Sequence, residues 1–378
     1  MADFSIKASP PTSVDRNQFF NSTANLRNYW FPVVPSNELT AKPLGLHLWG
    51  DPLILYREPA LNVAVALEDL CPHRAAPLSV GRISDARAKL PAARVRQYPV
   101  READEWVWVW PGDPESAEQR EPPGVYLAWG RPRDVRPWTG YIDLDIDHSL
   151  LVENFLDPAH LPFTHDTTIS KRANATSLTI KDVHFSLESV KGTQVTPERP
   201  DLPGVQFEFR PPCLVALKFR ADRATPQPSP SPPTHAKDPA GDSAPPVKFQ
   251  AFDQTFYAIP TRKGHCRFIY FQRMPFIPDP AAALWSYVPP LKWMTSWYLH
   301  RFNKRVLLED YALLKGVQKN LRWGAKAIDK RTAAPADTIV MVYRDWWRKM
   351  IGAGQVWFAG YSSDIEDIHL DNCNTCGD

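Results

Sequence analysis

The residue types best suited to chemistry stand together in residues 154–165, NFLDPAHLPFTH. Asp157 and His160 are three residues apart, so on a helix they would share one face. His160 and His165 are five apart, and Pro162 disfavours helical geometry just before it, so we expect a bend that lets both imidazoles converge. Two neutral imidazoles and one carboxylate are the ligand set of a non-haem Fe(II) centre that keeps positions open for O2.

A second motif is Cys71-Pro-His73-Arg74. A Cys and a His two residues apart are half of the two-Cys, two-His set that holds a Rieske [2Fe–2S] cluster. The flanking sequence suits such a loop, because residues 63–67 predict an incoming strand and residues 75–81 an outgoing loop.

These motifs show what the chain is similar to. It resembles the Rieske-type non-haem iron oxygenases, and within them the chlorophyll-related branch that includes pheophorbide a oxygenase and chlorophyllide a oxygenase. The resemblance covers residues 27–378. It is carried by residues 28–33 (NYWFPV), 70–79 (LCPHRAAPLS) and 154–165, by Trp293, His300, Asn303, Val306, Asp310 and Gln318 of a late helix, by residues 335–337 and 343–346, and by the final Cys373-Asn-Thr-Cys376.

The resemblance implies a role for each polar residue of the 154–165 block. His160 and His165 would be iron ligands, and Asp310 would be the carboxylate ligand. Asp157 would link the iron-binding His160 to the cluster of a neighbouring subunit, and Asn154 would lie behind the ligands. Asp157 and Asn154 are therefore the candidate catalytic residues beside the metal.

Asp310 also stands out by its surroundings. It lies in a helical stretch between leucines at 307–308 and 313–314, and a carboxylate in so apolar a setting needs a partner. Its neighbour Glu309 is a competing carboxylate ligand. Both residues could instead be surface charges of an exposed helix, and the sequence leaves these alternatives open.

The resemblance also implies a second cluster pair, Cys-x-x-His, about 15–20 residues after His73. Residues 83–94 contain neither Cys nor His, and neither of the two central cysteines stands in such a pattern. An internal deletion, a skipped exon or a faulty gene model would leave this gap. With two of four ligands, we expect the [2Fe–2S] cluster to be absent or labile. The terminal Cys373 and Cys376 form either a redox dithiol or two reduced surface cysteines.

Composition excludes several other classes of protein. The 378 residues carry 44 Lys plus Arg against 42 Asp plus Glu, a net charge of +2, which argues against a nucleic-acid partner. Five cysteines are too few for a disulfide scaffold. No apolar run is long enough to span a membrane, and no targeting signal is readable. The aromatic-rich residues 281–299 suit a core or pocket wall, or peripheral contact with a membrane surface.

Hydrophobic periodicity indicates an α+β protein. We expect strands at 29–34, 53–56, 63–67, 105–110, 205–220 and 248–274, and helices at 149–155 and 297–321. Residues 1–26 are predicted to be an N-terminal tail, and residues 27–140 a truncated Rieske-like antiparallel β domain with an incomplete cluster motif. Residues 141–378 would form a catalytic domain with an antiparallel sheet, a long helix over a mononuclear iron site, and a Pro-rich insertion at 225–247.

The resemblance implies an oxygenase that uses O2 on a chlorophyll-derived tetrapyrrole, of the pheophorbide a or chlorophyllide a class, with ferredoxin as electron donor. It further implies a homotrimer in a plastid or the cyanobacterial equivalent. The incomplete cluster motif keeps two alternatives open. One is a non-catalytic pigment- or partner-binding protein at a plastid membrane, and the other is a cluster-independent Fe(II) enzyme that takes electrons from a small reductant.

Overall fold

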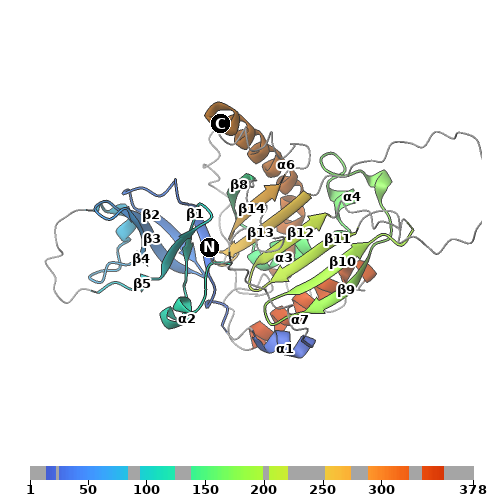
Figure 1. The fold of residues 1–378 in the computed structure, drawn as a ribbon, viewed down its shortest axis with the longest axis horizontal. Coiled ribbons are helices and arrows are strands. Elements are labelled where there is room, and N and C mark those ends of the chain that lie inside the picture. Colours follow the sequence, from blue (N-terminus) through green and yellow to red (C-terminus); the bar gives the residue numbers. More distant parts are fainter. Residues whose placement is uncertain are drawn as a thin grey trace, which may run out of the picture.

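The computed structural model describes residues 14–22, 25–83, 94–123, 138–198, 204–219, 252–273, 288–322 and 334–352. It confirms an α+β protein, in which two small antiparallel sheets adjoin one larger antiparallel sheet and its helices (Figure 1). Within those ranges, no helix combines the length and the apolar character that crossing a bilayer requires.

The N-terminal unit contains the two small sheets, ordered β2-β3-β4-β5 and β1-β7-β6. Their strands are β1 (Phe31–Pro35), β2 (Leu44–Leu48), β3 (Asp51–Glu58), β4 (Val63–Glu68), β5 (Gln97–Tyr98), β6 (Val100–Ala103) and β7 (Trp106–Val109). The loop that carries Cys71 and His73 follows β4 and precedes a short 3-10 turn, η1 (Leu78–Val80). A short helix, α2 (Pro114–Glu118), closes the unit, with Asp113 as its N-cap.

The larger sheet has seven antiparallel strands in the order β8-β14-β13-β12-β11-β10-β9. They are β8 (Trp138–Leu144), β9 (Thr179–Phe185), β10 (Val190–Val195), β11 (Val205–Arg210), β12 (Leu214–Phe219), β13 (Phe252–Pro260) and β14 (Cys266–Arg273). β12 and β13 pair directly, with Leu214 opposite Tyr257. The Pro-rich residues 225–247 lie outside the described residues, between these two paired strands. The expected domain boundary at residue 140 falls inside β8.

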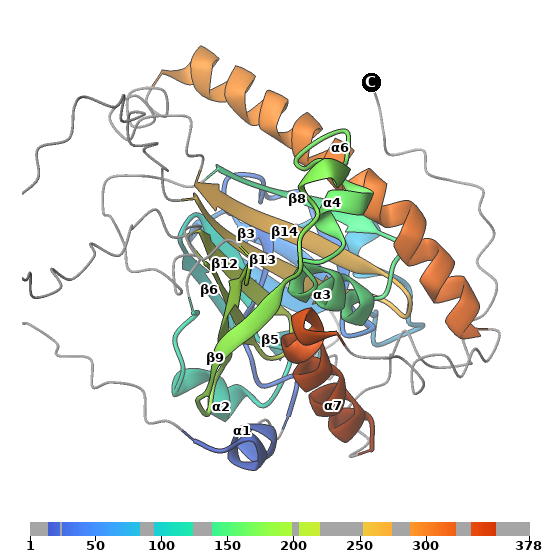
Figure 2. The ribbon, with the colours of Figure 1, turned by 90° about the vertical axis from the view of Figure 1, so that its right-hand side faces the viewer.

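Helices accompany the larger sheet (Figure 2). They are α1 (Arg16–Ser22), α3 (His148–Leu156), α4 (Leu161–Thr164), α6 (Pro289–Arg322) and α7 (Thr338–Gly352), with 3-10 turns η2 (Arg172–Asn174) and η4 (Pro335–Asp337). The long helix begins eight residues before the predicted start at 297, because Pro289 and Pro290 suit a first helical turn. One face of α6 is buried; it consists of Leu299, Asn303, Leu307, Asp310, Leu314, Gln318 and Leu321.

Buried aromatic rings join the two units. Trp106 of β7 packs against Phe271 of β14, with ring centroids 5.4 Å apart, and Trp108 packs against Tyr257 of β13 at 5.9 Å. Both indoles are fully buried. The N-terminal unit is therefore part of the continuous hydrophobic core that supports the large sheet.

The turn between β2 and β3 makes a second junction. Trp49 (φ 53°) and Gly50 (φ 83°) both adopt left-handed conformations, as two-residue hairpin turns of type I′ require. Their amides donate to the carbonyls of Pro260 and Thr261, at 2.9 and 2.8 Å. The Trp49 ring also meets the buried His148 ring of α3, with centroids 5.3 Å apart. The turn thus joins the N-terminal unit to the end of β13 and to α3 of the larger unit.

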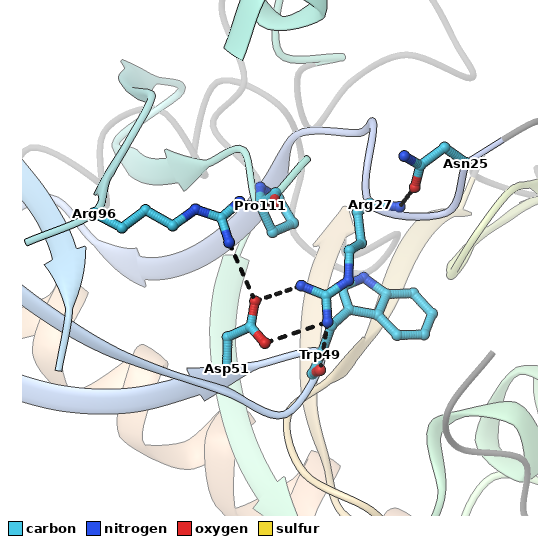
Figure 3. Close-up of polar contacts among 6 residues, drawn as sticks. All are labelled: Asn25, Arg27, Trp49, Asp51, Arg96 and Pro111. Atoms are coloured by element: carbon cyan, nitrogen blue, oxygen red, sulfur yellow. Dashed lines mark hydrogen bonds and ion pairs between the residues drawn. The ribbon is translucent and has the colours of Figure 1, made fainter. Parts of the chain in front are cut away.

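Charged side chains secure the base of this turn (Figure 3). Arg27 pairs with the Asp51 carboxylate and donates to the Trp49 carbonyl at 3.1 Å. Arg96 lies 4.0 Å from the same carboxylate and donates to the Pro111 carbonyl at 3.1 Å. Asp51 therefore holds three separate stretches of the N-terminal unit together.

Candidate metal centre

The segment between α3 and α4 presents the two central histidines. α3 ends at Leu156, and Asp157 follows with extended geometry (φ −103°, ψ 98°). The cause is Pro158, because a proline disfavours helical geometry in the residue before it. Asp157 and His160 therefore lie on a turn, and the expectation that they share a helix face is wrong. The chain bends at Asp157, five residues before Pro162, which occupies the first turn of α4.

The bend brings both imidazoles to a carboxylate from a distant helix. Ligand atoms of His160, His165 and Asp310 all lie within 4.8 Å of one another. Asp310 Oδ1 is 3.5 Å from His160 Nε2 and 3.2 Å from His165 Nε2. Asp310 sits on the buried face of α6, and His165 is buried as well. The structure thus brings together the three residues for which iron ligation was expected.

Unsatisfied polar atoms test whether a cation fits this cluster. His160 Nδ1, His160 Nε2 and Asp310 Oδ1 are buried without a hydrogen-bond partner among the described residues. A buried polar atom left unpaired costs about 1–3 kcal/mol. A divalent cation between the two Nε2 atoms and the carboxylate would satisfy several of these atoms at once, so the residues present fit a mononuclear metal.

Each imidazole also meets a second carboxylate on its other nitrogen. His160 Nδ1 is 3.6 Å from Asp157 Oδ2, and His165 Nδ1 is 2.8 Å from Glu309 Oε2. Burial opposes the charged form of Asp157, but its interaction with His160 outweighs burial and lowers the pKa of the carboxyl. Burial likewise disfavours a charged His165, but Asp310 and Glu309 outweigh it and raise the pKa of that imidazole.

The geometry distinguishes the two adjacent acidic residues of α6. Asp310 faces the two Nε2 atoms, whereas Glu309 lies on the Nδ1 side of His165. The Thr167 and Thr168 hydroxyls donate to the Glu309 carboxylate, at 2.9 and 2.6 Å. Sequence reasoning missed both threonines, because a hydroxyl pair after a histidine has no distinctive pattern. Asp310, and not Glu309, therefore has the position of a metal ligand.

Three other polar residues that the resemblance singled out make contacts around the site. Asn154 is half-buried on α3, and its carbonyl accepts from the Asp157 amide at 3.2 Å. Asn303 donates to Gln272 of β14 at 2.8 Å. Gln318 accepts from the Asp147 amide at 2.7 Å, at the start of α3. The contacts of Asn303 and Gln318 fix α6, and so Asp310, against β14 and against the start of the helix that leads to the histidines.

The Cys71 loop has a different character. Its turn is closed by two hydrogen bonds, from the Ala75 amide to the Cys71 carbonyl at 2.7 Å and from the Cys71 amide to the Ala76 carbonyl at 2.8 Å. Cys71 is half-buried and His73 is exposed. Residues 74–147 contain no further Cys or His.

No other described cysteine completes the four-ligand set. Cys213 and Cys266 are buried in the large sheet, and burial raises the pKa of both thiols, which disfavours the thiolate form that binds metal. Cys373 and Cys376 lie outside the described residues. The described residues therefore offer two of the four ligands of a [2Fe–2S] cluster, whereas they offer all three expected ligands of the histidine site.

Family models of known proteins match parts of both units. Residues 29–90 match the family model of the Rieske [2Fe-2S] domain, and residues 209–326 match that of pheophorbide a oxygenase. Chloroplastic chlorophyllide a oxygenase of Chlamydomonas reinhardtii is 26% identical over 352 residues, which cover 85% of this chain and 48% of that protein. The dicamba O-demethylase oxygenase component of Stenotrophomonas maltophilia is 35% identical over 176 residues, which cover 40% and 49%.

The chain spans about half the length of these curated relatives. Among solved structures, dicamba monooxygenase bound to 3,6-dichlorosalicylic acid superposes with a TM-score of 0.61 and 22% identity. That superposition covers 87% of this chain and 99% of the other. It supports a shared fold across both units.

Proposed function

Because the chain belongs to the Rieske oxygenase family, with a Rieske domain followed by a pheophorbide a oxygenase domain, we propose that it oxidises a chlorophyll-derived tetrapyrrole with O2. The substrate would be of the pheophorbide a or chlorophyllide a class. The match to the pheophorbide a oxygenase model and the similarity to chlorophyllide a oxygenase support this substrate class.

The convergence of His160, His165 and Asp310 is the observation that carries the proposal. These residues would hold one Fe(II), which supplies O2 activation when it is bound. With three protein ligands, these residues would leave other positions on the metal open, as an enzyme that must admit O2 requires. Asp157 keeps a carboxylate beside His160 Nδ1, and its side chain is 33% exposed, so this residue links the metal site to the surface.

Aromatic residues support the histidine segment from the core. Phe155 stands two residues before Asp157 and packs on the buried Phe256 and Phe268, with ring centroids 4.6 and 5.1 Å apart. This packing fixes the end of α3, from which the histidine segment continues.

Partners and location are further parts of the proposal. The N-terminal strands β2–β5 and helix α4 lie on opposite sides of the molecule in the view of Figure 1, which supports a homotrimer in which one copy's N-terminal unit contacts the next copy's metal site. Exposed Trp297 and Tyr298, with Arg301 5.2 Å from the Trp297 ring, support peripheral membrane contact through α6. Ferredoxin as electron donor and a plastid location rest on the resemblance to the chlorophyll-related branch.

A turnover assay with isotopically labelled O2 tests the proposed reaction. Anaerobically purified protein would be loaded with Fe(II) and supplied with reduced ferredoxin and pheophorbide a or chlorophyllide a. We expect mass spectrometry to show product oxygen that derives from O2, and His160→Ala to abolish both bound iron and product. His184→Ala is the matched control, because His184 is exposed on β9. Equal product from His160→Ala, or turnover of dicamba with no pigment turnover, would contradict the proposal.

The incomplete cluster ligand set favours one second function, a non-catalytic protein that binds pigment or a partner. Cys71 and His73 are the only Cys and His residues between positions 48 and 147. Quenching of pheophorbide a fluorescence by the protein, with no product in the turnover assay and no stoichiometric iron, would establish this alternative. Product formation would exclude it.

A further inference from the structure

We infer that Glu309 is a positioning residue, which orients the His165 ring so that its Nε2 faces the metal position. The inference rests on the proposed function in one respect, namely that a metal binds between His160, His165 and Asp310. Glu309 was also a candidate for direct metal ligation, but it lies on the Nδ1 side of His165, away from the metal position. Three contacts of the Glu309 carboxylate carry it.

The first contact sets the tautomer of His165. Glu309 Oε2 lies 2.8 Å from His165 Nδ1. An ionised carboxylate can only accept hydrogen bonds, so Nδ1 must carry the proton in this contact. The lone pair of the neutral ring then lies on Nε2, the atom that is 3.2 Å from Asp310 Oδ1. Metal-binding histidines commonly owe their orientation to a carboxylate on the other ring nitrogen.

The other two contacts hold the carboxylate itself. Thr168 Oγ1 donates to Oε2 at 2.6 Å, and Thr167 Oγ1 donates to Oε1 at 2.9 Å. The backbone ties this threonine pair to the histidine, because the Thr168 amide donates to the His165 carbonyl at 3.1 Å. Glu309 therefore joins α6 to the segment after α4 at the point where both elements contribute to the metal site.

The contrast with the second imidazole shows how specific this arrangement is. His160 meets Asp157 at 3.6 Å, beyond hydrogen-bond distance, whereas His165 meets Glu309 at 2.8 Å. Glu309 and Asp310 are also the only acidic residues among the 34 residues of α6. One of them faces Nε2 and the other faces Nδ1 of the same ring. We expect His165 to be the pre-organised ligand and His160 the adjustable one.

Metal binding measured with Co(II) tests the inference without reference to turnover. Competition titrations would give the dissociation constant for wild type, Glu309→Ala and Glu309→Gln. We expect about 10- to 100-fold weaker binding for Glu309→Ala, the range found for removal of such supporting groups, and a smaller loss for Glu309→Gln, which keeps an acceptor. Glu188→Gln makes the same substitution in an exposed turn and should bind as wild type does.

A second readout separates positioning from general stabilisation. In the Co(II) protein, each bound imidazole should give one strongly shifted, solvent-exchangeable N–H proton signal, hence two signals from His160 and His165. Glu309→Ala should abolish the His165 signal through fast exchange with water, and Thr168→Val should broaden it. Asp157→Asn should affect only the other signal.

The outcomes separate the proposed metal site from the proposed role of Glu309. Wild-type protein that binds no Co(II) and shows no shifted signals would overturn the proposed metal site itself. Wild-type protein with both signals, together with a Glu309→Ala variant of equal affinity and an unchanged spectrum, would overturn the role of Glu309 alone. Loss of Co(II) affinity with loss of one exchangeable signal would support both.

Discussion

The segment of His160 and His165 and the loop of Cys71 and His73 are both short sequences that suggest a metal ligand set, but they differ in what surrounds them. The histidine segment receives a third donor, Asp310, from a helix about 150 residues away along the chain, and its ligand atoms lie within 4.8 Å. The Cys71 loop receives no further Cys or His from the described residues. Its His73 is exposed, whereas His165 is buried.

This difference shows that a metal motif is completed by the fold rather than by its own spacing. The histidine segment follows α3, which packs against α6, against α7 and against strands β12 and β13 of the large sheet. The N-terminal unit also has buried side chains, but Trp106 and Trp108 pack against the large sheet and not around the Cys71 loop. The unit can therefore be kept for its contribution to the core, whether or not it holds a cluster.

Trp106→Ala should give the largest effect, a loss of stability that tests whether the N-terminal unit supports the large sheet. Trp106 is fully buried and contacts both Phe271 and Tyr141 of the larger unit. Removal of a buried aromatic side chain costs about 3–5 kcal/mol of the free energy of unfolding. Urea unfolding followed by circular dichroism should show this loss, and the two units should unfold together.

Trp297→Ala is the matched control, because Trp297 is 53% exposed on the outer face of α6 and its loss should change stability little. If Trp106→Ala lowered stability no more than Trp297→Ala does, the N-terminal unit would not support the large sheet. A separate early transition of the N-terminal unit would contradict the single shared core.

The junction between the units should also make stability depend on pH through His148. Its ring is fully buried between Trp49 and Trp347, with centroids 5.3 and 5.2 Å away, and burial lowers its pKa despite the nearby Asp147. The unfolded chain therefore binds more protons than the folded chain below the ordinary value of 6.5. Stability should be complete above pH 6.5 and fall below it, by at most about 1.4 kcal/mol per pH unit.

Thermal unfolding between pH 5 and 8 measures how far His148 makes stability depend on pH. His148→Phe should flatten the decline below pH 6.5, because the ring contacts remain and the titrating nitrogen is lost. His184→Gln should keep the wild-type decline, because His184 is exposed on β9. An unchanged pH profile in His148→Phe would mean that the junction does not contribute to the pH dependence.

The fold and much of the site could be predicted because their signals are local. Alternating strands, the amphipathic face of α6 and the 154–165 block all appear in short stretches of sequence. The resemblance to a known family then paired Asp310 with the histidines. The structure confirms the α+β architecture and brings those three residues together.

What could not be predicted depends on the approach of distant residues. The contact of Glu309 with Thr167 and Thr168 forms only when α6 lies along the segment after α4. The turn at Asp157 was missed for a different reason, because the spacing of Asp157 and His160 suggested one helical face. The effect of Pro158 on the residue before it proved stronger.

The smallest expected effect is the one that would most directly break the contrast between the two motifs. Cys71→Ala and His73→Ala alter a loop that, among the described residues, has only half of a ligand set, and His73 is exposed. We expect each variant to leave iron content unchanged and to shift the free energy of unfolding by no more than about 0.5 kcal/mol. Iron and acid-labile sulfide would be measured on anaerobic protein, with EPR after dithionite reduction. A Rieske signal in wild type that Cys71→Ala removes would mean that the fold or a second copy supplies the missing ligands, so that both motifs are completed in the same way.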